Sequence, residues 1–466
     1  MEISISKKDI FWSYVAKFFQ IASGFFTLPF VLRLLSPNEV GLNYLMITVS
    51  SMVALIDFGF SPQFGRNFAF VNSGAQKLLK EGVDESHSSQ INYRLLKTTI
   101  KTAQYVYRKL SIVAFVLMLT GGTYYMYTVT NGFTLVDNSL IIWLIFSVSV
   151  YFSIYFSYYT GLLTGSGLIA QNNQAAILSR MAYMAISITM LYCGCGLFSI
   201  VIANLIAPFF SRFYAYFHYY TPELREKLNV GDISNEEVQE TFAIIWHNAK
   251  KQGLNFISTY IVTKFGMFLA GLYLTLSEIG SFGLLMQLTT ILTGLGIAFY
   301  LAIEPQLISL NVNNNIDGLQ KKFSMSMVVY YSIMLIGGSA IIFIAPWAIE
   351  LIGSNTSLPP TGICATYMLV LGLEYNHCIF GGLIATKNTF PMIKAYLVSS
   401  FGVLFLTYLF LQFTDLNLWG VVLAEGIIQA LYNNWYWPNV GCKKYGLTFS
   451  KIMVIGSTEL SKKLHL

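Results

Sequence analysis

Charged residues are scarce in this chain, and their scarcity restricts the class of protein. Asp, Glu, Lys and Arg make up 11% of the 466 residues, whereas a soluble globular domain carries roughly a quarter. Hydrophobic residues make up 55%, and the mean hydropathy is +0.59. Several uncharged runs reach the roughly 20 residues that a helix needs to cross a hydrocarbon layer. Runs of this length are too long for the strands of a membrane barrel. The composition therefore predicts an all-α polytopic membrane protein.

Cysteine is also rare, and the signatures of catalysis are missing. The five cysteines form no CxxC pair, and no His or Cys stands beside them at a recognised zinc-ligand spacing. We therefore expect neither a disulfide framework nor a metal site, and no cofactor. No phosphate-cradling glycine loop with its Lys occurs, and no Ser, His and acid residues form a nucleophile context. The expectation is a protein that is not an enzyme.

A short pattern occurs twice in the chain. Residues 32–44 contain a Leu-Ser-Pro-x-Glu-x-Gly-Leu segment, and residues 276–284 resemble it; an apolar span follows each. Matching Gly41 with Gly283 gives an offset of 242 residues, about half of the chain. Such internal similarity predicts two halves with the same fold.

Hydropathy predicts twelve transmembrane helices in two repeated six-helix lobes. The helices are expected near residues 10–32, 41–64, 108–128, 138–163, 173–193, 197–217, 252–273, 281–303, 323–349, 361–386, 392–411 and 418–438. The first run is longer than a signal-peptide core and has no small-residue cleavage pattern after it, so we expect it to be a true span. The predicted domains are an N-terminal lobe, a linker with an amphipathic helix, a C-terminal lobe and a cytoplasmic tail: 1–217, 218–251, 252–441 and 442–466.

The distribution of basic residues predicts the orientation of these helices. Of the 28 Lys and Arg residues, 24 fall in segments on one side of the membrane; the other four are Lys17, Arg33, Arg180 and Lys264. Basic loop residues are retained on the cytoplasmic side, so both termini are predicted to be cytoplasmic. This asymmetry accounts for the net charge of +6 without nucleic acid as a partner.

Two cytoplasmic connections have recognisable patterns. Ser234 and Glu237 have capping-box spacing ahead of apolar residues, which predicts an amphipathic helix on the inner membrane surface. Before the third span, four cations recur on one helical face: Arg94, Lys97, Lys101 and Arg108. They are either a solvated face near anionic headgroups or a basic lip that attracts a phosphate-bearing lipid.

Ionisable residues inside the predicted spans are candidates for function, because a central charge costs roughly 3 kcal/mol or more. Lys17 and Asp57 fall at matching depths of the first two helices, which predicts an ion pair that either faces the substrate or holds the first lobe together. Arg180 is expected within about two turns of a membrane face, where a long side chain reaches water.

In the second half, Lys264 falls near the middle of the seventh predicted helix and Glu374 near the middle of the tenth. His377 follows Glu374 by three residues on the same helical face. A carboxylate beside a histidine can take up and release a proton or cation, as ion coupling requires. The alternative is a static ion pair between Lys264 and Glu374.

Several of these segments resemble a known family. The residues concerned are Leu35-Ser36-Pro37-x-Glu39-x-Gly41-Leu42, Leu55-Ile56-Asp57-Phe58-Gly59-Phe60 with Arg66, and Gly381-Gly382-Leu383-Ile384-Ala385-Thr386. In these segments the chain resembles the bacterial polysaccharide repeat-unit flippases, the Wzx-type branch of the multidrug, oligosaccharidyl-lipid and polysaccharide exporter superfamily. The first 70 residues carry the most specific part of the resemblance.

The resemblance implies two six-helix lobes around a cavity in the bacterial cytoplasmic (inner) membrane. The implied activity is alternating-access flipping of an undecaprenyl-pyrophosphate-linked oligosaccharide for O-antigen, lipopolysaccharide or capsule synthesis, coupled to H⁺ or Na⁺. The implied partners are the lipid-linked substrate, the lipid bilayer and, as a candidate, a glycan polymerase. In the resembling superfamily, some members hold a coupling cation with acids on helices seven and ten; here Glu374 fits, whereas Lys264 stands where an acid is wanted. The open alternatives are a cation-coupled multidrug or metabolite antiporter and a membrane glycan polymerase or ligase.

Overall fold

The computed structural model describes residues 7–80, 90–386 and 391–464, and all the secondary structure within these ranges is helical. The side chains of residues 7, 10, 14, 21, 22, 251, 252, 254–264, 463 and 464 lie outside this description. The prediction of an all-α chain is therefore confirmed for the described residues. The described chain divides into two compact units, which we call unit one (Met1–Ile257) and unit two (Ser258–Leu466).

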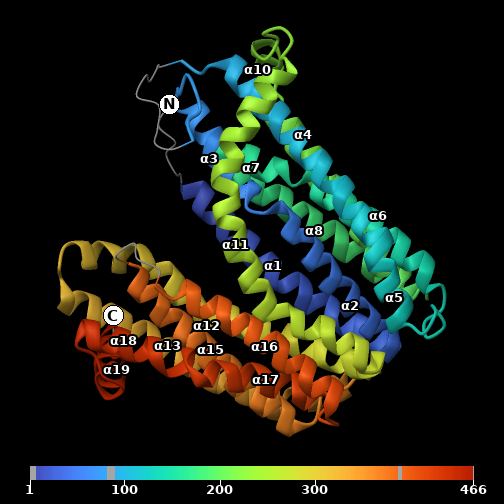
Figure 1. Cartoon of the computed structure of the whole chain (residues 1–466), viewed down its shortest axis with the longest axis vertical. Helices are drawn as coiled ribbons and strands as arrows, with labels where there is room; N and C mark the ends of the chain where they lie inside the picture. The colour runs from blue at the N-terminus through green and yellow to red at the C-terminus, as the bar shows by residue number, and fades with distance from the viewer. Residues whose placement is uncertain (1–6, 81–89, 387–390, 465–466) are drawn as a thin grey trace. The chain divides into compact units, whose positions relative to one another are not determined.

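Figure 1 traces the helices of both units in chain order, from blue to red. The helices of unit one are α1 (Lys7–Leu34), α2 (Pro37–Ala54), η1 (Leu55–Asp57), α3 (Phe60–Asn72), α4 (Tyr93–Leu117), η2 (Met118–Gly122), α5 (Thr123–Val129), α6 (Ser139–Phe156), α7 (Tyr158–Gly165), α8 (Ile169–Tyr192), α9 (Phe198–Tyr219) and α10 (Pro222–Lys227). The helix α11 (Asn235–Tyr273) begins in unit one and ends in unit two.

The remaining helices of unit two are α12 (Leu276–Val312), α13 (Ile316–Phe343), α14 (Ala345–Leu351), α15 (Thr361–Ala385), α16 (Ile393–Phe413), α17 (Leu418–Leu431), α18 (Asn433–Tyr445) and α19 (Phe449–Leu464). A core of buried aromatic and aliphatic side chains lies in each unit. Phe64, Phe68 and Tyr107 centre the core of unit one, and Phe323 and Phe380 belong to that of unit two.

Ten helices in the described part of the chain are long and apolar enough to cross a membrane. They correspond to ten of the twelve predicted spans. The seventh predicted span falls in α11, where side chains 254–264 are not described. The twelfth is divided at Tyr432 between α17 and α18, so neither piece alone is long enough. The finding is a multi-pass membrane protein.

The repeated pattern forms the same helix-to-helix turn in both units. The Ser36 hydroxyl accepts a hydrogen bond from Glu39 N, and the Glu39 carboxylate accepts one from Ser36 N. Thr275 and Glu278 form the same capping box at the start of α12. These boxes correct the repeat offset to 239 residues, because Ser36 matches Thr275 and Glu39 matches Glu278.

The second predicted span is not one helix. After α2 the chain tightens into the 3₁₀ turn η1, and then Phe58 and Gly59 adopt positive φ angles of 46° and 83° before α3 begins. Positive φ is strained for residues with a Cβ, and glycine avoids this strain. The prediction of an unbroken helix over 41–64 is therefore wrong.

The linker helix and the seventh predicted span form one helix. The Ser234 and Glu237 capping box is present, as the sequence indicated, with Ser234 N donating to Glu237 over 2.9 Å. From there α11 continues for 39 residues, with no break at residue 252. Its Phe242 and Trp246 stack on Phe60 at the start of α3, with ring centroids 6.1 and 5.5 Å away.

The predicted cytoplasmic tail is largely ordered as helix. Residues 442–445 complete α18, and α19 packs along α13 through the buried side chain of Ile452. Gly456 of α19 lies so close to the Ser324 backbone that a Cβ would overlap its carbonyl oxygen. The tail is therefore part of unit two rather than an appendage.

Candidate functional site

The four predicted basic-lip residues belong partly to contacts within unit one. Arg94 Nε lies 2.8 Å from Glu237 Oε1, and Lys97 Nζ donates to the Gly231 carbonyl over 2.7 Å. The neighbouring Arg94 guanidinium lowers the pKa of Glu237 to about 2. Lys101 is half-buried and Arg108 is exposed. Two of the four cations therefore hold the linker against α4.

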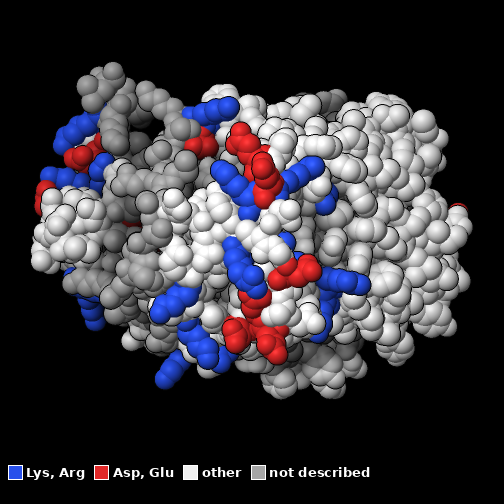
Figure 2. Space-filling model, turned by 90° about the horizontal axis from the view of Figure 1, so that it is seen from above, with Lys and Arg blue, Asp and Glu red and all other residues white. Residues whose placement is uncertain are grey.

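Figure 2 views the molecule from above, looking onto the end where Figure 1 places α10. Lys and Arg side chains on this face are interspersed with Asp and Glu side chains. Neighbouring opposite charges neutralise one another at short range, so the face is a mixed-charge surface. This arrangement favours the interpretation of a solvated face over that of a purely basic lip.

The carboxylate of Asp57 has two partners, and Lys17 is not one of them. Tyr107 donates its hydroxyl to Asp57 Oδ1 over 2.7 Å, and Ser61 N donates to Oδ2 over 3.2 Å. Ser61 lies in the first turn of α3, where unpaired N–H groups and the helix dipole favour an anion. In the part of the chain described here no ion pair joins Asp57 to Lys17, so that prediction is wrong. Asp57 stabilises the helix break.

Lys17 and Arg180 lie on packed neighbouring helices at nearly the same depth. Asp9 of α1 accepts a hydrogen bond from Ala170 N of α8, and Asn173 donates to Ser13. The two residues of these pairs differ in number by 161 and 160. Arg180 of α8 is therefore expected at the same level as residues 19 and 20 of the chain, which lie in α1. Lys17 is therefore within about 5 Å of Arg180 along the helix axis.

Both cations are exposed, and both lie deep within their helices. Because α8 begins at Ile169 rather than near residue 173, Arg180 is the twelfth of its 24 residues. The expectation that Arg180 lies within about two turns of a membrane face stays a prediction. Among the charged residues predicted for the first half, these two lie on packed helices at a similar position along the helix axis.

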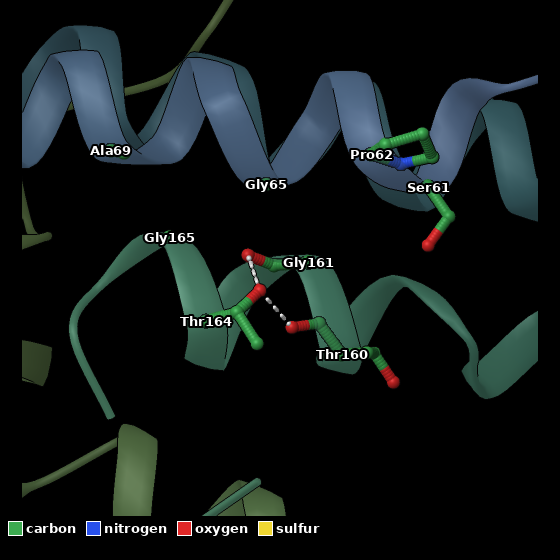
Figure 3. A pocket seen from close by; sticks show the side chains of 8 residues that line it. All are labelled: Ser61, Pro62, Gly65, Ala69, Thr160, Gly161, Thr164 and Gly165. Atoms are coloured by element: carbon green, nitrogen blue, oxygen red, sulfur yellow. Dashed lines mark hydrogen bonds between the residues drawn. The ribbon is translucent and has the colours of Figure 1, made fainter. Parts of the chain in front are cut away.

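A pocket of about 430 Å³ lies between α3 and α7. Small residues dominate its lining: Ser61, Pro62, Gly65, Ala69, Thr160, Gly161, Thr164 and Gly165. Figure 3 shows the glycines at the close approach of the two helices, with Thr164 bonded back to the carbonyls of Thr160 and Gly161. The spacing of Gly161 and Gly165 is typical of close helix packing in membranes, so we interpret the pocket as the edge of a packing contact.

Arg212 of α9 is a half-buried cation that the sequence analysis did not single out. Its guanidinium lies over the rings of Tyr159 and Tyr216, 4.3 and 4.9 Å from their centroids. Aromatic faces stabilise a cation at this range, and Tyr159 is stacked close to Tyr158 at 4.3 Å. The tyrosines spaced along 151–159 were a visible signal, but the partner on α9 was not.

Glu374 and His377 lie together on α15, as their spacing predicted. Glu374 Oε1 is 3.6 Å from His377 Nε2, and the side chains are 13% and 1% exposed. Glu425 of the neighbouring helix α17 is close enough to Glu374 to repel its charge. The side chain of Lys264 is outside the described residues, so its pairing with Glu374 stays a prediction.

The arrangement of these helices can be compared with that of known proteins. No protein-family model matches the sequence, and no curated protein matches it. Among solved structures, the chain aligns with the lipid II flippase MurJ in an inward closed conformation, with a TM-score of 0.65 and 14% identity over 97% of this chain and 91% of that one. It also aligns with an inward-facing multidrug resistance MATE family transporter of the MOP superfamily, with a TM-score of 0.60 and 14% identity over 95% and 96%.

At this level of identity the likeness establishes the fold. The chain therefore has the fold shared by transporters of the MOP superfamily, and enzymes are not among these neighbours.

Proposed function

We propose that this protein is a flippase that moves an undecaprenyl-pyrophosphate-linked oligosaccharide from the inner to the outer leaflet of the cytoplasmic membrane. Two observations support the proposal: the fold is shared with a lipid II flippase, and Lys17 and Arg180 are exposed at matching depth on packed helices. The second observation carries it, because a multidrug transporter has the same fold.

The chemistry of the substrate explains why such cations are needed. Moving a charged pyrophosphate out of water into a low-dielectric region is costly unless hydrogen-bond donors of the protein replace the water molecules that it loses. Lys and Arg form short charge-assisted hydrogen bonds to phosphate oxygens, and Arg can do so in bidentate fashion. A pair of cations about 5 Å apart along the axis can contact both phosphates of one substrate. Lys264 is a third candidate donor.

Glu374 and His377 are the proposed positions for ion coupling. Two neighbouring carboxylates, Glu374 and Glu425, lie in apolar helices, where a proton or cation relieves their repulsion. Asp57, which the sequence offered as a residue of the substrate cavity, has no role in this proposal, because its carboxylate accepts hydrogen bonds from Tyr107 and Ser61. Association with a glycan polymerase, and a place in O-antigen or capsule synthesis, follow from the substrate class and share its status as a proposal.

The competing candidate is a cation-coupled antiporter for drugs or metabolites. The carboxylates of Glu374 and Glu425 favour it only if they face the transported molecule, whereas the Lys17 and Arg180 pair repels an organic cation. The two candidates therefore differ in the sign of charge that these two positions select.

The test is transport by the purified protein in sealed vesicles. A fluorescent undecaprenyl-pyrophosphate oligosaccharide is placed in one leaflet, and its exposure to a membrane-impermeant quencher is followed. Replacing Lys17 or Arg180 by Gln removes a charged hydrogen bond of about 1.5–3 kcal/mol, so flipping should fall roughly 10- to 100-fold. Lys17→Arg keeps the charge and should retain most activity.

Lys8→Gln is the matched control, since Lys8 is an exposed cation at the cytoplasmic start of the same helix. It should leave flipping unchanged. A wild-type protein that exports an organic cation and leaves the labelled lipid in place would instead establish the antiporter. Unchanged flipping in both Gln variants would remove the two cations from the mechanism.

A further inference from the structure

Three side chains with different metal-binding chemistry converge on one turn of α15. They are the carboxylate of Glu374, the imidazole of His377 and the thiol of Cys378. Residues at positions i, i+3 and i+4 share one helical face, so a single turn presents all three. One ligand atom from each lies within 4.8 Å of the others.

The separations suit a small tetrahedral ion. Glu374 Oε1 lies 3.6 Å from His377 Nε2 and 4.0 Å from Cys378 Sγ. Zinc bonds of about 2.0–2.3 Å at tetrahedral angles place neighbouring ligand atoms roughly 3.3–3.8 Å apart. The two measured separations are therefore at or slightly beyond the range expected around one bound ion.

The second ring nitrogen of His377 is already held. Nδ1 lies 2.8 Å from Asn434 Oδ1 of α18, and since a carbonyl oxygen only accepts, Nδ1 carries the proton. This bond leaves the Nε2 lone pair directed toward Glu374. Metal-binding histidines characteristically donate their other N–H to an oxygen in this way, which fixes both the tautomer and the ring orientation.

The charge and accessibility of the cluster also suit a cation. Glu374 Oε2 is buried and has no hydrogen-bond partner among the described residues. Glu425 places a second carboxyl group nearby. Cys378 is exposed, so the cluster reaches the surface of the unit through its thiol.

We propose that Glu374, His377 and Cys378 bind a divalent transition-metal ion of the Zn²⁺ class, with a fourth coordination position open. Thiolate and imidazole ligands select such ions, whereas Na⁺, Mg²⁺ and Ca²⁺ prefer oxygen ligands. Binding releases the proton of the Cys378 thiol to solvent, since the thiolate is the ligand. The inference concerns binding alone and holds whether or not the chain moves lipid-linked oligosaccharides.

This proposal departs from the expectation, drawn from the sequence, of no metal site. That expectation considered cysteines paired with cysteines or at zinc-finger spacing. A mixed carboxylate, imidazole and thiol set within five residues of one helix does not match those spacings. Asn434, which orients the histidine, lies 57 residues from it in the sequence.

The experiment is direct binding of Zn²⁺ and Co²⁺ to the full-length protein in detergent. The wild-type protein should bind Zn²⁺, and the Cys378→Ser variant should bind one Zn²⁺ ion fewer per chain. Co²⁺ should give a thiolate-to-cobalt charge-transfer band with the wild type and no such band with Cys378→Ser. Glu374→Gln, which keeps the side-chain shape, should also weaken binding. Asn434→Ala should weaken it about 10- to 100-fold, as removal of an orienting partner typically does.

Cys193→Ser is the matched control, because Cys193 is an exposed cysteine outside the cluster. It should bind Zn²⁺ as the wild type does. The variants are compared only where their thermal unfolding matches that of the wild type, and Cys378→Ser, at an exposed position, is the one least expected to disturb folding. Zinc binding that survives both Cys378→Ser and Glu374→Gln, or that an excess of Na⁺ displaces, would overturn the assignment.

Discussion

The helix that follows the repeated turn is broken in unit one and continuous in unit two. Both copies begin with the same capping box, at Ser36 and at Thr275. In unit one the helix stops at η1 and restarts as α3, whereas α12 runs for 37 residues without interruption. The same capping-box pattern is therefore followed by a broken helix in unit one and by an unbroken helix in unit two.

The residues at the break account for the difference. By the offset of 239, Asp57 and Gly59 correspond to Gly296 and Ala298. Gly59 permits the positive φ, and Asp57 accepts hydrogen bonds from the new helix start and from Tyr107. Ala298 favours an uninterrupted helix, and Gly296 offers no carboxylate to cap a restart. The residues at these two positions thus account for the break in unit one and its absence in unit two.

The largest contrast is expected when one glycine in each unit is replaced by alanine. Gly165→Ala places a Cβ against the Gly65 carbonyl oxygen and Phe68, and such overpacking costs about 1–3 kcal/mol. Gly294→Ala meets nothing within 4 Å and should stabilise α12 by up to about 1 kcal/mol. Thermal unfolding in detergent should shift in opposite directions. A similar shift for both would show that the α3 and α7 contact yields easily.

Exchanging the residues at the break tests the comparison directly. Gly59→Ala puts a Cβ where φ is 83° and should cost about 1–2 kcal/mol. Ala298→Gly, at the corresponding exposed position of α12, should cost about 0.5–1 kcal/mol through helix propensity. Denaturation midpoints measure both. If Gly59→Ala stabilises the protein, the break is not required by the fold.

The two capping boxes should differ when their acids are removed. Glu39 Oε1 also accepts a hydrogen bond from Leu197 N at the start of α9, over 3.0 Å. Glu39→Ala leaves that N–H without its partner, so it should cost about 1 kcal/mol more than Glu278→Ala. Gly196 lies against the same carboxylate, so Glu39→Ala is made with Gly196 unchanged. Equal losses of unfolding free energy would contradict the bridging role.

The smallest expected difference concerns pH. The depressed pKa of Glu237, about 2, means that its pairing with Arg94 stabilises unit one above pH 4.5 and is lost as pH falls toward 2. Lys462 likewise lowers the pKa of Glu459, but both residues belong to α19. The protection factors of the amides of residues 231–237, which compare each exchange rate with the intrinsic rate at the same pH, should therefore fall on acidification, and Arg94→Gln should remove that fall. Exchange that is already fast at neutral pH would contradict a tethered linker.

Local signals predicted the local structure well. The capping box at Ser234 was predicted because Ser234 and Glu237 stand three residues apart, the spacing at which the two residues make both hydrogen bonds. The all-helical membrane class followed from hydropathy. The break at Asp57-Phe58-Gly59 was missed because an apolar run was taken as one helix, although its glycine was a visible signal.

Contacts distant in the sequence could not be predicted in the same way. Tyr107 as the partner of Asp57 and Asn434 as the partner of His377 depend on which helices pack together. The matching depth of Lys17 and Arg180 depends on the true start of α8, four residues before the expected one. Charge position along a helix was predictable, but its partner required the fold.

The packing of α19 on α13 sets a practical boundary for work on this protein. A fusion partner or affinity tag joined after residue 464 leaves this contact intact, whereas a truncation at residue 442 strips a helix from unit two. The exposed face of α13 would then present Val328 and neighbouring apolar side chains to water or detergent. Such a shortened chain is an aggregation hazard, and topology reporters inserted there would report on a damaged protein.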